Sequence, residues 1–300
     1  MRSETLNIAG HDFHVVVAGD PSKPAILMLH GFPEYSGAFS ELIAELQDEF
    51  FCIAPDQRGY GQSWRPAEVE HYAASKLVGD ALAMLGHYSP DTPVAAVLGH
   101  DWGAAVAYGL AFRHPDRVQK LIVANGVHPI PFQRALAAGG AQSEASQYIN
   151  WLRADESEDK LATNNHARMM GIFSKHMDMS WMTPEKRAAY QTAWGDADLV
   201  RGMVNWYRAS FLKVADPGVP LQEEDLPNLP PHLLHVPMPH LLLWGENDTA
   251  LLPECYAGLE DHCTDLTIQT IPEADHWLLH QKPAEVAQYI RSFLTRSAHS

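Results

Sequence analysis

Short apolar runs and amphipathic stretches alternate through most of this 300-residue chain. The runs are rich in Val, Ile and Leu and show no polar alternation, which is typical of strands buried on both faces. They lie at residues 14–19, 25–32, 50–56, 94–101, 120–126, 240–248 and 266–272. The amphipathic stretches, which we expect to be helices, include residues 38–49, 72–86, 102–113 and 283–296. Alternating strands and helices predict an α/β fold built on a mostly parallel sheet.

The alternation stops in the middle of the chain. Residues 131–216 contain no convincing strand pattern and read as aromatic-rich helices, which we expect to form a cap inserted between two strands of the core. Seven prolines follow between Pro217 and Pro239, and a proline-rich stretch is stiff and extended. The sequence thus predicts a core in two parts, 1–130 and 240–300, with a helical cap over 131–216 and a connector over 217–239.

Composition limits the possible partners. The formal net charge of −16 disfavours nucleic acids and anionic membranes, because both repel an acidic surface. Three cysteines without metal-like spacing argue against a disulfide scaffold. The N-terminus lacks the apolar segment of a signal peptide, and no apolar run has the length of a membrane span. We expect a cytoplasmic enzyme.

The stretch Gly99-His100-Asp101-Trp102-Gly103 has the form Gly-x-nucleophile-x-Gly between a predicted strand and a predicted helix. The glycines permit a sharp turn that exposes the central side chain at the carboxyl end of the sheet. A serine hydrolase has Ser at the centre, whereas this chain has Asp101. The alternative is an ordinary aspartate at a helix N-cap. Other candidate catalytic residues, placed where this fold needs them, favour a nucleophile.

The backbone amides of Phe32 and Trp102 are candidates for an oxyanion hole. Phe32 lies in the sequence HGFPE, residues 30–34, directly after a predicted strand. In α/β hydrolases, the amide after the nucleophile and one from this earlier loop bind the oxyanion. An ordinary Gly-Pro turn is the simpler interpretation.

Asp248 and His276 complete a candidate triad. Asp248 ends a predicted strand, where an acid can orient a histidine, although a turn aspartate is an alternative and Glu246 is a nearby rival. His276 follows the last predicted strand. The chain order nucleophile, acid, histidine is that of the α/β-hydrolase fold. We interpret the other motif histidines, His30, His100 and His280, as loop or packing residues.

Several motifs together resemble the epoxide hydrolases of the α/β-hydrolase superfamily. They are HGFPE, DQRGYGQS, GHDWGAA, HPDRVQKLIVANGVHP, LLLWGENDTALLPE and DHWLLHQKPAEVAQYIRSFL. The resemblance covers the predicted core, roughly 1–130 and 235–297. The haloalkane and haloacetate dehalogenases are related families that share the aspartate nucleophile.

The resemblance implies a reaction and the residues that perform it. Asp101 would form an ester with an epoxide carbon, and water activated by His276 and Asp248 would hydrolyse that ester. Two cap tyrosines would donate hydrogen bonds to the epoxide oxygen; Tyr207 stands in a matching N-W-Y-R context, and Tyr148 is the candidate for the other. The substrate would be a small apolar epoxide, with no metal or organic cofactor.

Two other functions remain open. Haloalkane dehalogenases typically pair the Trp after the nucleophile with an Asn in the loop that here carries Phe32, or with a second cap Trp. Haloacetate dehalogenases have two arginines where this chain has Trp102 and Ala105. A non-catalytic binding protein on the same scaffold would often lack a triad member, and here all three are present.

The sequence departs from the family pattern directly before the candidate base. Asp275 stands where a Gly is usual. A carboxylate at this position can raise the pKa of the imidazole or simply face solvent, and we favour the second interpretation.

Overall fold

The computed structural model describes residues 1–296, so the last four residues of the predicted second core part, 297–300, lie outside it. Within residues 1–296, eight strands form one sheet in the order β1-β2-β4-β3-β5-β6-β7-β8. They are β1 (Arg2–Ile8), β2 (His11–Ala18), β3 (Ala25–Leu29), β4 (Phe51–Pro55), β5 (Ala96–His100), β6 (Leu121–Ala124), β7 (Val236–Gly245) and β8 (Cys263–Ile271). The pairs β1–β2 and β2–β4 are antiparallel, and the remaining pairs are parallel. The predicted α/β fold is confirmed.

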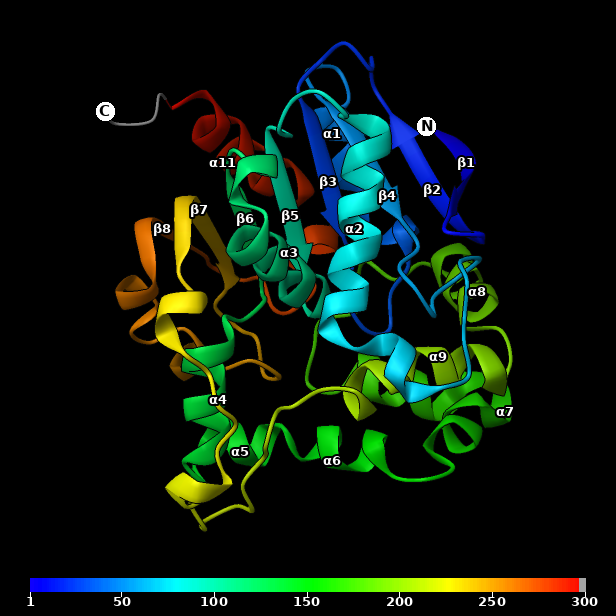
Figure 1. Ribbon diagram of the computed structural model, residues 1–300. Helices are drawn as coiled ribbons and strands as arrows, with labels where there is room; N and C mark the ends of the chain where they lie inside the picture. Colours follow the sequence, from blue (N-terminus) through cyan, green and yellow to red (C-terminus); the bar gives the residue numbers. More distant parts are fainter. Residues whose placement is uncertain (297–300) are drawn as a thin grey trace.

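Helices cover both faces of the sheet because its strands carry apolar side chains on both sides. On β3, Leu27 and Leu29 join one core cluster, while Ile26 and Met28 join the other. Helices α2 (Ala74–Tyr88) and α3 (Trp102–Arg113) pack on the first side, and α1 (Ser40–Leu46) and α11 (Pro283–Thr295) pack on the second. Figure 1 shows these two layers on either side of the sheet.

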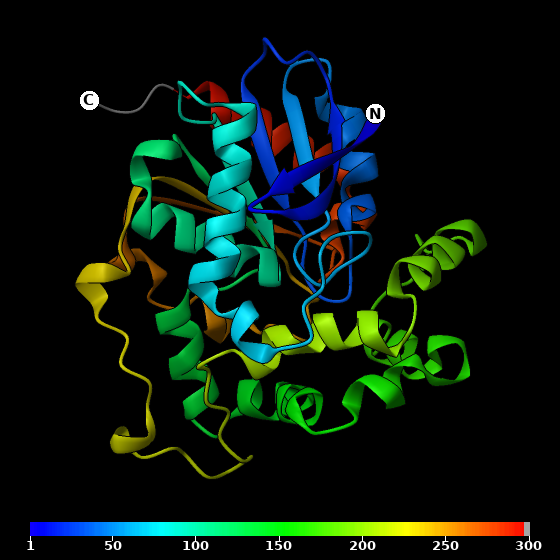
Figure 2. The ribbon, with the colours of Figure 1, turned by 45° about the vertical axis from the view of Figure 1, so that its right-hand side comes forward.

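A run of helices separates β6 from β7, and we call residues 129–208 the helical insert. Its helices are α4 (Pro129–Ala137), α5 (Ala141–Ala145), α6 (Gln147–Arg153), α7 (Ser157–Phe173), α8 (Pro184–Trp194) and α9 (Ala197–Arg208). Figures 1 and 2 show these helices gathered below the sheet, in green to yellow-green. Helix α7 is interrupted at residues 163–166, where the backbone dihedrals are not helical.

Three details differ from the sequence-based expectations. Residues 2–8 form an edge strand that was not predicted; one face of this strand is exposed and the other only half-buried, so it lacks a continuous apolar run. The first helix of the insert begins at Pro129, two residues before the predicted cap. Residues 236–239 of the predicted connector belong to β7, where a register shift between Val236 and Pro239 accommodates the two prolines.

Candidate active site

Asp101 lies in the turn between β5 and α3, with φ 50° and ψ −119°. A positive φ is strained for a residue with a side chain, and such strain often occurs at functional sites. Glycines make the turn possible: a Cβ on Gly103 would lie 1.9 Å from the Leu29 carbonyl oxygen, and one on Gly31 would lie 2.2 Å from Asp101 Oδ1. The turn therefore presents the carboxylate at the end of β5, against the loop that follows β3.

Two backbone amides surround the Asp101 carboxylate. The Phe32 N–H donates to Asp101 Oδ1 at 2.7 Å. Burial raises the pKa of Asp101, while the nearby His276 and His100 and the amides of Phe32 and Trp102 oppose that rise. The structure thus brings together the carboxylate and the two amides that the sequence analysis selected.

Asp248 and His276 form a buried pair in the loops that follow β7 and β8. His276 Nδ1 lies 2.7 Å from Asp248 Oδ2, and the Asp248 side chain is fully buried. The other oxygen, Asp248 Oδ1, accepts hydrogen bonds from the amides of Ala250 and Leu251 at 2.8 and 2.9 Å. Glu246, the rival acid, is exposed. The geometry orients the imidazole with Nε2 free to face the reaction centre.

His276 faces two carboxylates. Its Nε2 lies 3.7 Å from Asp101 Oδ2, on the side opposite Asp248. Burial lowers the pKa of His276, but the charges of Asp248 and Asp101 and the hydrogen bond to Asp248 outweigh burial and raise the pKa to about 9. The imidazole is therefore an imidazolium near neutral pH as long as Asp101 is ionised.

Tyr207 on α9 and Tyr148 on α6 lie over this centre. The ring of Tyr207 makes edge-to-face contacts with Phe32 and Trp102, with centroids 5.2 and 5.1 Å apart. The Tyr148 and Tyr207 rings are 6.2 Å apart. Burial raises the pKa of both hydroxyls, and the charge of Asp101 raises it further. Both side chains therefore remain O–H donors across the physiological pH range.

Asn125 is a site residue that the sequence analysis missed. It follows β6, its Nδ2 donates to Asp248 Oδ2 at 2.5 Å, and its Oδ1 accepts from the Gly245 amide at 2.8 Å. The sequence that follows the predicted strand at 120–126 contains no carboxylate, and an acid was the expected partner of the histidine. The signal that could have identified Asn125 is its side-chain amide at the end of a parallel strand, because the ends of neighbouring strands meet at one edge of the sheet.

A buried polar network behind His276 was also missed. Glu34 Oε2 bonds His100 Nδ1 at 2.9 Å and Glu34 Oε1 bonds His280 Nε2 at 2.8 Å, while the Tyr190 hydroxyl donates to Glu34 Oε1 at 2.9 Å. Burial would raise the pKa of Glu34, but the two histidines hold it well below its usual range. His100 Nε2 lies 2.8 Å from the His276 carbonyl oxygen. His100 and His280, two of the histidines interpreted as packing residues, thus connect Glu34 with the segment that carries His276.

The expectation that Asp275 faces solvent is wrong. Asp275 is only 4% exposed. Its Oδ2 accepts from the Asp178 amide at 2.6 Å and its Oδ1 from the Trp277 amide at 2.9 Å. These two amides satisfy the carboxylate, so it turns away from water and toward the helical insert.

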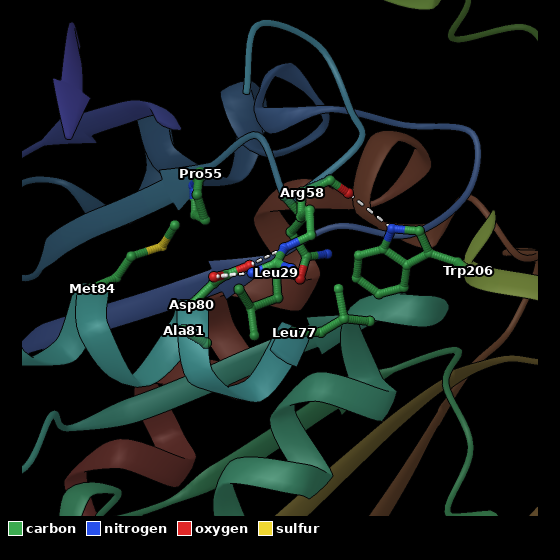
Figure 3. Close-up of a pocket in the computed structure, with 9 residues that line it drawn as sticks. Leu29, Pro55, Arg58, Leu77, Asp80, Ala81, Met84 and Trp206 are labelled. Atoms are coloured by element: carbon green, nitrogen blue, oxygen red, sulfur yellow. Dashed lines mark hydrogen bonds and ion pairs between the residues drawn. The ribbon is translucent and has the colours of Figure 1, made fainter. Parts of the chain in front are cut away.

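A second buried ion pair anchors the helix that carries Tyr207. Arg58, in the loop after β4, makes a two-pronged contact with Asp80 on α2, at 2.8 Å from Nε and 2.6 Å from Nη2. The Arg58 carbonyl accepts from Trp206 Nε1 at 2.9 Å (Figure 3). The cavity at this junction has a volume of about 10 Å³, which leaves room for one water at most. The junction is thus a structural support rather than a substrate site.

Within residues 1–296, no helix has the length and apolar character needed to cross a membrane. No cluster of three or more His, Cys, Asp or Glu suited to a metal ion occurs in the same described part of the chain.

This fold is that of a known family. Residues 24–283 match the α/β hydrolase fold family, and the chain belongs to that family. Among its relatives, AB hydrolase superfamily protein YfhM of Bacillus subtilis (strain 168) is 31% identical over 98% of both chains.

The more specific similarity is to epoxide hydrolases, as the sequence motifs predicted. Epoxide hydrolase 4 of Homo sapiens is 31% identical over 95% of this chain and 76% of that protein. A solved structure from a study of novel epoxide hydrolases in metagenomes from hot environments is 34% identical, with a TM-score of 0.88 and 99% of each chain covered. A mutant of an epoxide hydrolase from Bacillus megaterium is 28% identical, with a TM-score of 0.86 and coverage of 98% and 100%.

Proposed function

We propose that this protein hydrolyses small apolar epoxides to vicinal diols through a covalent ester of Asp101. The observation that carries the proposal is the placement of one carboxylate between an amide and a histidine: Asp101 Oδ1 accepts from Phe32 N at 2.7 Å, and Oδ2 lies 3.7 Å from His276 Nε2. A carboxylate suits displacement at an sp³ carbon, whereas an acyl group on it would form a reactive anhydride. The names of the similar proteins support the same reaction class.

The first step opens the epoxide. Asp101 Oδ2 attacks a ring carbon, a carbon–oxygen bond of the ester forms, and the ring carbon–oxygen bond breaks. Oδ1 stays in its hydrogen bond with the Phe32 amide. The ring oxygen takes up negative charge, and the hydroxyls of Tyr148 and Tyr207 stabilise it by donating hydrogen bonds.

Esterification removes the charge of Asp101, which is one cause of the raised pKa of His276. The pKa of the imidazole therefore falls from about 9, and the proton that His276 releases balances the proton gained by the alkoxide. The neutral imidazole, held by Asp248, is then the general base for the next step.

The second step hydrolyses the ester. His276 Nε2 takes a proton from water as the water oxygen attacks the carbonyl carbon of Asp101. Negative charge develops on Oδ1, where the amides of Phe32 and Trp102 stabilise it; one such donor contributes about 3–4 kcal/mol in related sites. Collapse of the tetrahedral intermediate breaks the bond between the Asp101 carbonyl carbon and the ester oxygen. The leaving oxygen takes the remaining proton of the added water, which gives the diol and regenerates the carboxylate. Only residues of this chain and water take part in these steps.

The substitution His276→Gln tests the proposal. Without the base, alkylation of Asp101 continues but ester hydrolysis slows by about 10²–10⁴-fold, so a covalent adduct accumulates. Intact-mass spectrometry after mixing with a styrene-oxide-like epoxide should show the protein plus one substrate mass. Peptide mapping should place the added mass on Asp101, and Asp101→Ala should remain unmodified.

Two results would contradict the proposal. Diol formation by His276→Gln at the wild-type rate would remove His276 from the mechanism. Halide release from a bromoalkane without diol formation from the epoxide would identify a dehalogenase, and binding without turnover of either compound would identify a binding protein.

A further inference from the structure

Residues 174–183, which join α7 to α8 and which we call the bridging segment, lie against both loops that carry the acid–base pair. Thr249 Oγ1, one residue after Asp248, lies 3.8 Å from Met177 Sδ. The ring of Trp181 stacks on His280 with centroids 3.8 Å apart and an interplanar angle of 2°. The segment contains neither α-helix nor strand, so its position depends on contacts with its neighbours.

The main chain of Asp178 is held by two side chains from the loop around His276. Its amide donates to Asp275 Oδ2 at 2.6 Å, and its carbonyl accepts from Gln281 Nε2 at 3.0 Å. Gln281 Oε1 in turn accepts from the Asp275 amide at 2.9 Å. Asp275 and Gln281 thus form a closed set of hydrogen bonds around one residue of the bridging segment.

The loop that provides these contacts is itself fixed to the sheet. The Asn247 amide donates to the Ala274 carbonyl at 2.9 Å, and a Cβ on Gly245 would lie 2.3 Å from the Asp275 carbonyl oxygen. The backbone of Asp275 is therefore fixed by close contacts with the end of β7. Its buried carboxylate forms no salt bridge within residues 1–296, so its charge strengthens its two hydrogen bonds to backbone amides.

We propose that Asp275 is a positioning residue that holds the bridging segment against the loops of Asp248 and His276 and so controls substrate binding. The inference rests on the proposed function for its kinetic readout, but the hydrogen bond that carries it is a property of the fold. Loss of the Asp275 carboxylate frees the Asp178 amide and loosens the segment. The contacts between His276 and Asp248 are made by other atoms and remain intact.

Two substitutions test the hydrogen bonds that the Asp275 carboxylate accepts from the Trp277 and Asp178 amides. Asp275→Ala removes both acceptor oxygens, whereas Asp275→Asn keeps one oxygen for two amides. Asp265→Asn, an exposed aspartate on β8, is the matched control. Hydrogen–deuterium exchange of the peptide around Asp178 should accelerate about tenfold in Asp275→Ala, because a hydrogen bond to a charged group is lost. Asp275→Asn should be intermediate, and the control unchanged.

Kinetics provide the second readout. We expect the KM for epoxide to rise about tenfold in Asp275→Ala, with the single-turnover alkylation rate at saturation within about twofold of wild type. Unchanged exchange at Asp178 would overturn the proposal. A fall in the saturating alkylation rate at constant KM would also overturn it, because the defect would then lie at the reaction centre. If the wild-type protein forms no diol, the proposed function fails while the exchange result still decides whether Asp275 holds the segment.

Discussion

At the scale of single residues, glycines and charged side chains at a few positions determine where the Asp101 carboxylate lies. Gly31 and Gly103 leave no space for a Cβ, because the chain packs there against the Asp101 carboxylate and the Leu29 carbonyl. The backbone of Asp101 is strained, with a positive φ, and this conformation places its carboxylate between the Phe32 N–H and His276. Motif spacing predicted the sharp turn at Asp101, but the contacts of Asn125 and Asp275 come from segments far apart in the chain.

The two tyrosines should affect the first step and not the second. Replacing Tyr207 by Phe removes one donor to the epoxide oxygen and should slow alkylation about 10–100-fold, while a Tyr148→Phe, Tyr207→Phe double variant should lose about 10²–10⁴-fold. Single-turnover kinetics that follow adduct formation provide the measurement. Tyr289→Phe, on α11, is the control. Normal alkylation by the double variant would show that another group protonates the ring oxygen.

At the scale of elements, α9 matters because it carries Tyr207 and is attached to the core beside it. Trp206 donates to the Arg58 carbonyl, and the Arg58 guanidinium is held by Asp80 on α2 (Figure 3). A helix of the insert is thus fixed to a loop of the core through a buried ion pair. The amphipathic pattern of α9 predicted a helix, but not which loop it would contact.

This anchor predicts a stability change that can be measured. Arg58→Met leaves the Asp80 carboxylate buried without its partner and should lower the free energy of unfolding by about 3–5 kcal/mol. Trp206→Phe removes only the hydrogen bond and some packing, so about 1–2 kcal/mol is expected. Urea unfolding gives both values, with Arg2→Met, at an exposed ion pair, as the control. An Arg58 variant as stable as the control would show that the ion pair contributes nothing to the anchor.

At the scale of the whole molecule, the parallel strands place distant segments side by side. β5, β6, β7 and β8 are neighbours in that order, so Asp101, Asn125, Asp248 and His276 meet at one edge of the sheet. The helical insert adds Tyr148 and Tyr207 from the other side. The charged groups Asp101, Asp248 and His276 are therefore buried next to one another, so the stability of the folded protein depends on their protonation and on pH.

The raised pKa of His276 predicts how stability varies with pH. The pKa is about 9 in the folded protein against 6.5 as a reference, so the stabilisation is complete below about pH 6.5 and is lost as the pH rises through 9. Relative to His276→Gln, the wild type should lose up to about 3 kcal/mol of unfolding free energy over this range. Urea titrations of both proteins at pH 6, 7.5 and 9 and about 25 °C measure how the difference in unfolding free energy changes with pH. A difference that does not change with pH would mean that His276 is not paired with the carboxylates.

The sequence alone determined the fold class, the family resemblance and the position of the sharp turn at Asp101. These depend on local patterns: apolar periodicity, glycines that permit a sharp turn, and short motifs in a fixed order. The same patterns selected Phe32, Trp102, Asp248 and His276, because strand ends can be located from the chain itself. The edge strand at 2–8 escaped detection, since its pairing partner rather than its own pattern makes it a strand.

Only the tertiary structure decided which polar groups meet. Asn125 reaches Asp248 across 123 residues of sequence, and Asp275 reaches the Asp178 amide across 97. A hydrogen bond depends on distance and direction within a few tenths of an ångström, and no periodicity or spacing encodes that for segments joined through a sheet and an inserted set of helices. For this reason the sequence identified Asp275 only as a departure from a family pattern, whereas the fold gave it a partner and a role that can be tested.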